Sequence, residues 1–280
     1  MKKCEKLGDI SATGYLFTHI KSGARLCYLA TEDDNKVFSV SFKTPPDNDC
    51  GTPHILEHSV LCGSRKYQAK DPFNELAKGS LNTFLNAMTY ADKTMYPIAS
   101  CNEKDFHNMM DVYLDAAFYP NIYTKKGIFL QEGWRYADGG DSPEITGVVF
   151  NEMKGALSDP ESRLAGVIAR SMFGNTTYGM ESGGDPDDIA DLTYEAFLDF
   201  HRKYYHPSNA YFYLYGDMDV FSCLEHIDTA YLSNFNVSND LPIITETNVP
   251  NAMEWISATY PAEENENDLE KGYFAYNINV

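Results

Sequence analysis

The segment His54-Ile55-Leu56-Glu57-His58 constrains the fold and chemistry of this chain more than any other part of its sequence. Two histidines four residues apart lie on one face of a helix, where both imidazoles can reach a single metal ion. Glu57 follows His54 by three residues and lies on the same side. Zinc peptidases combine two helical histidine ligands with a helical glutamate that takes a proton from water, and the order here is the inverted HExxH motif. The segment therefore predicts a helix with a catalytic zinc site.

The residues around this motif also favour a helix. Thr52 can cap it and Pro53 can take its first position, where a missing N–H costs nothing, and Gly63 marks its end. A helix whose histidines only pack, cap or face solvent would show the same pattern. The start signal directly before His54 argues against that alternative.

A catalytic zinc ion usually has three protein ligands and an open position for water, so a further ligand must come from elsewhere. Cys62 lies four residues after His58, but the helix rises about 12 Å from His54 to Cys62, too far for one ion, and buried apolar filler is the expected role of this thiol. The remaining candidates are Glu132 and Glu152, and their spacing does not choose between them. Glu152 interrupts an apolar stretch, where a carboxylate needs a metal or a cation as its partner.

The chain as a whole predicts an α+β fold, with a mostly antiparallel sheet packed with helices. Strands and helices mix without the strict alternation of a doubly wound sheet. The N-terminal strands alternate apolar and polar residues between short polar turns, which is typical of an antiparallel meander. The predicted strands are 14–20, 25–30, 37–43, 81–89, 94–100 and 210–215, and the predicted helices are 53–61, 72–79, 102–118, 123–136, 147–158, 162–172, 194–205 and 220–233.

Composition divides the chain into a large N-terminal domain and a short C-terminal part. Residues 1–235 form the predicted catalytic zinc metallopeptidase domain, and the polar residues 236–252 form a linker. Residues 253–280 contain two predicted strands, 253–260 and 271–279, around an acidic loop. Two strands cannot bury a core of their own, so we expect the chain to stop inside an incomplete second domain.

The chain is strongly acidic. Its 41 acidic and 22 basic side chains give a formal net charge of −19 at pH 7, which repels nucleic acid and anionic lipid and favours cationic peptides. An acidic surface can equally serve solubility. No apolar run is long enough to span a membrane, the N-terminus has no signal or transit pattern, and the six cysteines form no CxxC pair. We therefore expect a cytoplasmic protein that binds neither nucleic acid nor a membrane.

Several sequence blocks resemble the pitrilysin/insulinase family of zinc metallopeptidases, specifically the presequence-protease branch that includes falcilysin-like enzymes. The blocks span most of the first 220 residues. They are 52–64 (TPHILEHSVLCGS), 78–89 (KGSLNTFLNAMT), 147–155 (GVVFNEMKG), 182–186 (SGGDP) and 204–210 (YYHPSNA).

The resemblance implies a pitrilysin-like metallopeptidase domain that holds one zinc ion. It makes Glu152 the third zinc ligand, beside His54 and His58, and so favours Glu152 over Glu132. It also makes Glu57 the general base that deprotonates a water activated by the metal.

The resemblance further implies how a substrate binds. It places Asn86 in a strand beside the zinc whose edge pairs with an extended peptide, with Ala87 as a second substrate-binding residue. The implied enzyme is an oligopeptidase-like endopeptidase for short unfolded peptides. Members of this family are close to four such domains long, and their two halves close around a chamber. We therefore expect this chain to be the N-terminal part of the enzyme, weakly active or inactive without the missing C-terminal half.

Two other functions fit the same residues. A non-catalytic pitrilysin-like subunit or zinc-binding scaffold would keep the fold without the chemistry, but such relatives usually lose a motif residue, and here all four are present. A structural zinc site would have no open position, and a glutamate ligand with Glu57 beside it suits a catalytic site better.

Overall fold

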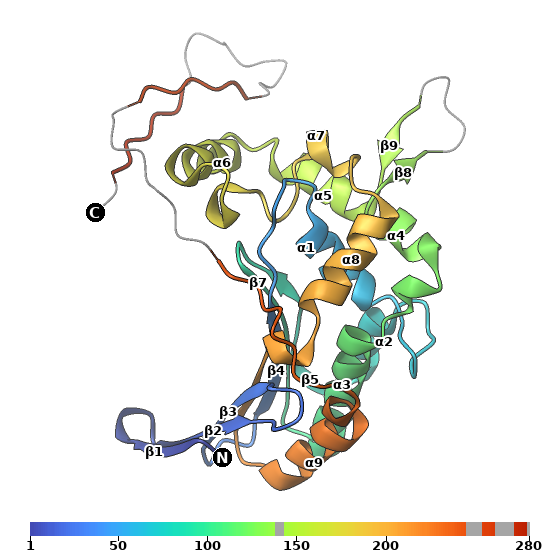
Figure 1. Ribbon diagram of the computed structural model, residues 1–280, viewed down its shortest axis with the longest axis vertical. Coiled ribbons are helices and arrows are strands. Elements are labelled where there is room, and N and C mark those ends of the chain that lie inside the picture. The colour runs from blue at the N-terminus through green and yellow to red at the C-terminus, as the bar shows by residue number, and fades with distance from the viewer. Residues whose placement is uncertain (138–142, 245–253, 261–271, 279–280) are drawn as a thin grey trace.

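The computed structural model describes residues 1–137, 143–244, 254–260 and 272–278, and Figure 1 shows their arrangement. The expected α+β fold is confirmed: a sheet of eight strands is packed with helices, and a separate ribbon has two short strands. Within the described residues, no helix combines the length and apolar character that crossing a bilayer requires.

The large sheet has the strand order β1-β2-β3-β10-β4-β7-β5, and β6 also pairs with β7. All neighbours are antiparallel except β10 and β3, which are parallel. The strands are β1 (Lys3–Leu7), β2 (Ala12–Thr18), β3 (Arg25–Ala30), β4 (Lys36–Lys43), β5 (Asn82–Leu85), β6 (Met88–Thr89), β7 (Lys93–Ser100), β8 (Arg135–Tyr136), β9 (Ile145–Thr146) and β10 (Ala210–Tyr215).

The α-helices pack on the sheet and around one end of it (Figure 1). They are α1 (Thr52–Val60), α2 (Pro72–Gly79), α3 (Glu103–Phe118), α4 (Lys126–Glu132), α5 (Val148–Ala156), α6 (Pro160–Phe173), α7 (Pro186–Ile189), α8 (Tyr194–Tyr204) and α9 (Val220–Ala230).

The N-terminal strands do not form the simple meander that their pattern predicted. β10 lies between β3 and β4, and β1 is an additional edge strand. Ala210, Phe212 and Leu214 of β10 are at most 2% exposed. These side chains are buried because β10 has a neighbouring strand on each edge and the face that carries them is covered. Alternation of apolar residues indicates which side chains face the core, but it does not encode the order of the strands.

One face of the sheet carries much of the core. Phe38, Val40 and Phe42 alternate along β4 and are fully buried, while α3 packs across β4 and β7. Burial of side chains of this size stabilises a fold by about 2 kcal/mol each. The sheet and α3 therefore form the rigid base against which the helices of the site are placed.

Several helix boundaries differ from the prediction, including those of α1 and α4. The N-cap position of α1 is Gly51, with φ 67°, and Thr52 is already inside the helix. α4 ends at Glu132, before residue 136, because Gly133 leaves the helix and the chain enters the ribbon of β8 and β9. The start of α2 is as predicted, since the Asp71 side chain accepts a hydrogen bond from the first turn.

The two strands predicted near the C-terminus do not form in the part of them that the structure describes. Residues 254–260 and 272–278 contain no helix or strand, and Met253, Lys271 and Asn279 lie outside the described residues. The rings of Trp255 and Phe274 lie 6.3 Å apart, yet these residues are 80% and 74% exposed. Two extended segments without a covering apolar layer lack the burial that stabilises a sheet.

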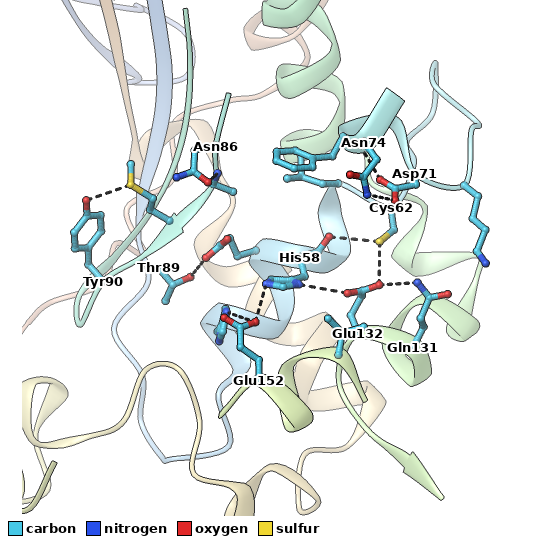
Figure 2. Close-up of a pocket in the computed structure, with 18 residues that line it drawn as sticks. His58, Cys62, Asp71, Asn74, Asn86, Thr89, Tyr90, Gln131, Glu132 and Glu152 are labelled. Carbon is cyan, nitrogen blue, oxygen red and sulfur yellow. Dashed lines mark hydrogen bonds and ion pairs between the residues drawn. The ribbon is translucent and has the colours of Figure 1, made fainter. Parts of the chain in front are cut away.

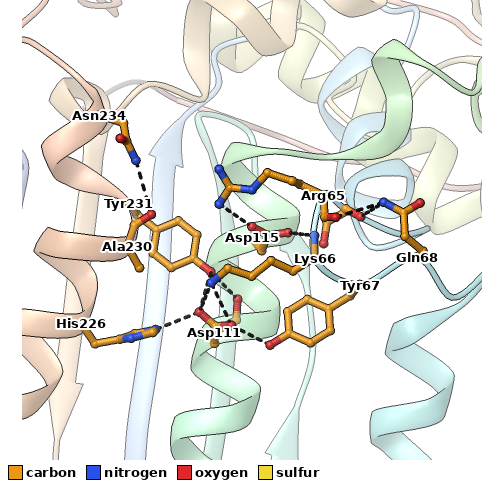
Figure 3. A network of polar contacts seen from close by, with 11 residues as sticks. Arg65, Lys66, Tyr67, Gln68, Asp111, Asp115, His226, Ala230, Tyr231 and Asn234 are labelled. Carbon is orange, nitrogen blue, oxygen red and sulfur yellow. Dashed lines mark hydrogen bonds and ion pairs between the residues drawn. The ribbon is translucent and has the colours of Figure 1, made fainter.

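A polar network fixes the segment between α1 and α2 (Figure 3). The Asp111 carboxylate of α3 accepts hydrogen bonds from Lys66 Nζ (2.8 Å), Tyr67 OH (2.6 Å) and Tyr231 OH (2.6 Å), and His226 Nε2 lies 2.8 Å from it. Burial raises the pKa of Asp111, but these hydrogen bonds outweigh burial and hold it well below its usual range. The network thereby joins this segment to α3 and to the end of α9.

His201 of α8 has a structural role. Its Nε2 lies 3.0 Å from the carbonyl oxygen of Ala117 in α3, and its Nδ1 lies 2.7 Å from the Tyr123 hydroxyl. A carbonyl only accepts, so Nε2 carries the proton and Tyr123 donates to Nδ1. Burial lowers the pKa of His201 to about 4.

We predict that His201→Asn reduces the loss of stability in acid. The pKa of His201 is about 4 in the folded chain and 6.5 when unperturbed, so its contribution is complete above pH 6.5 and is lost as the pH falls toward 4. The shift corresponds to about 3 kcal/mol of unfolding free energy. Urea unfolding of both proteins at about pH 7 and about pH 4.5 measures this difference. Equal losses in the two proteins would contradict it.

Candidate metal centre

Helix α1 forms one wall of a cavity of about 890 Å³. Residues of α2, of the β5–β6 segment, of α4 and of α5 line the rest of it, as Figure 2 shows around His58. On α1, Ile55, Leu56 and Val60 are fully buried in the core. This packing turns the opposite side of the helix, with His54 and His58, toward the cavity.

Glu152 of α5 faces both imidazoles. Its Oε2 lies 3.8 Å from His54 Nε2 and 3.7 Å from His58 Nε2. One ligand atom from each of the three residues lies within 4.8 Å of the other two, and no other three His, Cys, Asp or Glu side chains in the described part of the chain converge in this way. The two imidazole planes are inclined by 79°, so the rings converge edge to face. The fold thus brings together the three residues that were predicted to bind a metal.

The outer nitrogens of both rings face hydrogen-bond acceptors. His54 Nδ1 lies 3.2 Å from the carbonyl oxygen of Gly183, and His58 Nδ1 lies 3.4 Å from Oε2 of Glu132. Carbonyl and carboxylate oxygens accept, so in both rings Nδ1 carries the proton and Nε2 keeps its lone pair. Both lone pairs then belong to the nitrogens nearest Glu152, which is the arrangement typical of metal-binding histidines.

Glu132, the other candidate ligand, lies away from the converging nitrogens, and so does Cys62, which helix geometry had already excluded. Glu132 and Glu152 are on opposite sides of the His58 ring (Figure 2). Cys62 is not simple apolar filler, because its Sγ lies 3.5 Å from Glu132 Oε1 and 3.5 Å from the carbonyl oxygen of His58, and its single S–H can donate to either of them. Burial raises the pKa of Cys62, so the thiol stays protonated near neutral pH.

Acidic groups dominate the electrostatics around His58. Burial lowers the pKa of His58, but the hydrogen bond with Glu132 and the charges of Glu57 and Glu152 outweigh burial, and its pKa is raised overall. Three carboxylates beside two imidazoles make a site that favours a cation, either a proton on His58 or a metal ion.

Glu57 lines the cavity and is 8% exposed. Its Oε2 accepts a hydrogen bond of 2.6 Å from the hydroxyl of Thr89 in β6 (Figure 2). This bond fixes the carboxylate beside the histidines and leaves the other oxygen for a group in the cavity.

Asn86 and Ala87 also line the cavity, but they lie between β5 and β6 and not within a strand, which corrects the expectation for Asn86. The Asn86 N–H donates to the carbonyl of Pro97 in β7 at 3.2 Å. Pro97 has no N–H to return the second bond of the pair, so the ladder is interrupted there. The buried Tyr113 hydroxyl donates to the Asn86 carbonyl instead, at 3.2 Å.

A close backbone contact holds the loop 182–186 against the start of α1. A Cβ on Gly51 would lie 2.6 Å from the carbonyl oxygen of Gly183 and 2.8 Å from Cα of Gly184. This contact brings the Gly183 carbonyl to His54. The loop also caps a helix, because the Asp185 side chain accepts a hydrogen bond at the start of α7.

The sequence did not indicate that Gly183, Thr89 and Tyr113 contact the site. A backbone carbonyl has no residue-type signal, so nothing pointed to Gly183. Thr89 lies in the block 78–89 that carries the family resemblance, but its partner Glu57 comes from another element. Tyr113 is one of 20 tyrosines, and only the tertiary contact distinguishes it.

A second polar cluster looks like a Ser-His-Asp triad but cannot act as one. Ser22 Oγ lies 2.7 Å from His19 Nδ1, and His19 Nε2 lies 3.1 Å from Asp228. Ser22 is fully buried, and its Oγ accepts a hydrogen bond from the Ala24 N–H. A nucleophile must be reached by its substrate, so this cluster stabilises the turn before β3.

Two family models match the sequence. Insulinase (Peptidase family M16) matches residues 41–126, which include His54, Glu57 and His58, and Peptidase M16 inactive domain matches residues 191–279. Protein HypA of Clostridium perfringens is 54% identical over 276 residues, which is 98% of this chain. The chain belongs to peptidase family M16.

The resemblance to the presequence-protease branch of M16 is confirmed. Presequence protease 1, chloroplastic/mitochondrial, of Arabidopsis thaliana is 51% identical over 236 residues, or 84% of this chain. The chain spans about a quarter of the length of these curated relatives, 28% of HypA and 22% of the Arabidopsis protein. The M16 inactive-domain model begins at residue 191, inside the predicted domain 1–235, so the boundaries of that domain and of the linker stay predictions.

Solved protease structures share the fold at low identity. A protease from Helicobacter pylori matches with a TM-score of 0.67 and 18% identity over 85% of this chain and 54% of that chain. Pitrilysin matches with a TM-score of 0.66 and 18% identity over 84% of this chain and 24% of that chain. Likeness at this identity establishes the fold alone, and it confirms the pitrilysin-like architecture.

We predict that Gly51→Ala destabilises the M16 domain by about 2 to 4 kcal/mol. The new Cβ meets backbone atoms of Gly183 and Gly184, which cannot move away, and φ is 67°. Gly155→Ala in α5 is the matched control, because a Cβ there meets nothing within 4 Å. The control is expected to be unchanged or at most about 1 kcal/mol more stable. Urea unfolding measures both variants, and a Gly51→Ala protein as stable as wild type would contradict the prediction.

Proposed function

We propose that this chain carries the metal-binding half-site of a zinc-dependent endopeptidase that hydrolyses short unfolded peptides. The observation that carries the proposal is the convergence of His54, His58 and Glu152, with Glu57 beside them. Membership of M16 and the names of the presequence-protease relatives support a peptidase.

The three residues fit zinc. Two imidazole nitrogens and one carboxylate oxygen are donors that zinc accepts in catalytic sites, where a fourth position stays open for water. Ligand atoms of a tetrahedral zinc ion lie about 3.3 Å apart, and the carboxylate oxygen of Glu152 lies 3.8 and 3.7 Å from the two nitrogens. All three ligand atoms lie within 4.8 Å of one another. Side-chain movements that shorten these distances by up to about 1.5 Å would bring all three within bonding distance of one ion.

When bound, zinc acidifies a water molecule and polarises a peptide carbonyl. The residues of the chain supply the proton transfers. Glu57, held by Thr89, accepts the proton of the attacking water through its second carboxylate oxygen and delivers it to the leaving amine. His54 and His58, with Nδ1 protonated, keep their lone pairs for the metal.

We propose that Asn86 and Ala87 bind the peptide substrate. β5 is an edge strand of the large sheet, and both residues line the cavity beside Glu57. An extended peptide that pairs with this edge would pass the metal centre. Tyr113 supports this segment by replacing the hydrogen bond that Pro97 cannot make.

We further propose that efficient hydrolysis requires sequence beyond these 280 residues, in a second half that closes over the cavity. This proposal is supported by the 28% share of HypA that the chain covers. The acidic charge of −19 favours cationic peptides as substrates. A cytoplasmic location stays a prediction, because the Arabidopsis relative is named for chloroplasts and mitochondria.

Glu57→Gln and Glu152→Gln test the proposed general base and the proposed third zinc ligand separately. Glu57→Gln should keep zinc and lose at least about a thousandfold in kcat, because an amide cannot accept the proton. Glu152→Gln should lose zinc, because the carboxylate ligand is gone. Zinc content is measured in the 280-residue chain, and peptide hydrolysis is measured in a chain extended to the length of its relatives.

Two results would count against this assignment. A Glu57→Gln protein that keeps its turnover would exclude Glu57 as the base, and a Glu152→Gln protein with full zinc content would exclude Glu152 as a ligand. Strong hydrolysis by the 280 residues alone would contradict the need for a second half.

Tyr113→Phe should raise KM for a peptide by about fivefold while kcat and zinc content stay unchanged. The change removes one hydroxyl hydrogen bond of about 1 kcal/mol from the substrate-binding segment. Tyr96→Phe is the matched control, since the buried Tyr96 hydroxyl contacts Tyr205 at 2.7 Å and not Asn86. Equal effects of the two substitutions on KM would contradict a specific role for Tyr113.

A further inference from the structure

Glu132, the last residue of α4, is a buried carboxylate that the proposed chemistry does not use. The residue is 6% exposed, although it lines the cavity. Burial of a charged carboxylate is costly unless hydrogen bonds compensate. Three groups surround it: His58 Nδ1 at 3.4 Å, Gln131 Nε2 at 2.7 Å and Cys62 Sγ at 3.5 Å. The His58 ring separates Glu132 from Glu152 (Figure 2).

We infer that Glu132 is a positioning residue for the metal centre: it holds the imidazole of His58 so that Nε2 faces Glu152, and it raises the affinity of that nitrogen for the metal. This inference rests on the proposed function, because the ligand role of His58 is itself part of that proposal. Carboxylates that accept from the outer nitrogen of a ligand histidine fix the ring and make the other nitrogen a stronger donor.

The two histidines differ in the group that faces their Nδ1 atom. The outer nitrogen of His54 faces a neutral carbonyl, that of Gly183, whereas the outer nitrogen of His58 faces the negative carboxylate of Glu132. Hydrogen bonds to ionised acceptors are roughly twice as strong as those between neutral groups. His58 is also the more exposed ring, with 27% of its side chain accessible against 12% for His54. The carboxylate thus acts on the histidine that packing restrains less.

The backbone places Glu132 at this position. α4 packs against α1, and Gly133, the residue after Glu132, lies close to α1. A Cβ on Gly133 would lie 3.2 Å from Ile55 Cγ2 and 2.9 Å from the carbonyl oxygen of Phe129. This tight approach sets the distance between the end of α4 and the ring of His58.

Metal affinity tests this inference directly. Glu132→Ala in the 280-residue chain should weaken Zn²⁺ binding by about 10- to 100-fold, as loss of such a partner does at other sites. Glu132→Gln keeps the size and one acceptor oxygen but not the charge, and it should lie between Glu132→Ala and wild type. Affinity is measured by competition with a chromophoric chelator, and the visible absorption of bound Co²⁺ reports the ligand geometry.

Cys62→Ala and Gln131→Ala are matched controls, because they remove the other two partners of Glu132 and leave the carboxylate. Each should bind Zn²⁺ within about threefold of wild type and keep the Co²⁺ spectrum. Circular dichroism and urea unfolding without metal check that each variant is folded. If Glu132→Ala fails to fold, Glu132→Gln carries the comparison.

The outcomes separate this inference from the proposed function. Wild-type affinity and an unchanged Co²⁺ spectrum in both Glu132 variants would overturn the inference and leave the proposed function intact. Equal losses in the Cys62 and Gln131 controls would also overturn it, since the effect would then be general packing. A wild-type chain that binds no zinc would instead refute the proposed function.

Discussion

The site depends on one constraint: helix α1 must be buried in the core and still present two imidazoles to a cavity. Seven of its nine residues are buried, and Ile55, Leu56 and Val60 are completely so. A helix packed on so many sides has no freedom to rotate, so packing alone sets the positions of His54 and His58. The close contact of Gly51 with the loop 182–186 fixes the start of the same helix.

This packing brings together groups that repel one another without a cation. Glu57, Glu132 and Glu152 surround two histidines, and Glu57 and Glu132 are at most 8% exposed. Hydrogen bonds from Thr89, Gln131 and Cys62 compensate part of the cost of burial. The raised pKa of His58 has the same origin, because a positive charge at this position is favoured. A divalent ion would neutralise more of the negative charge of these carboxylates than one proton does. The arrangement therefore suits a metal ion.

The segment that lines the substrate side of the cavity lies where the hydrogen-bond ladder between β5 and β7 is interrupted. Pro97 in β7 leaves one hydrogen bond of the Asn86 pair unmade, and the chain at Asn86 and Ala87 leaves regular strand structure beside Glu57. Tyr113, on α3, restores one hydrogen bond from the opposite direction. The rigid base formed by the sheet and α3 therefore controls the geometry of the segment proposed to bind peptides.

The sequence by itself determined the features that depend on neighbours along the chain. The spacing of His54, Glu57 and His58 predicted one helical face, the helix predicted over 72–79 had the start of α2 right, and the alternation in β4 predicted its buried side, because helix and strand periodicity are local properties. Spacing could not choose between Glu132 and Glu152, and the family resemblance was needed to favour Glu152. Only the tertiary structure put Glu152 across from both Nε2 atoms and Glu132 behind His58. Only the tertiary structure also decided the place of β10 and the contacts of Gly183, Thr89 and Tyr113. Each of these contacts joins segments that are far apart in sequence, and such segments meet only when the whole core packs.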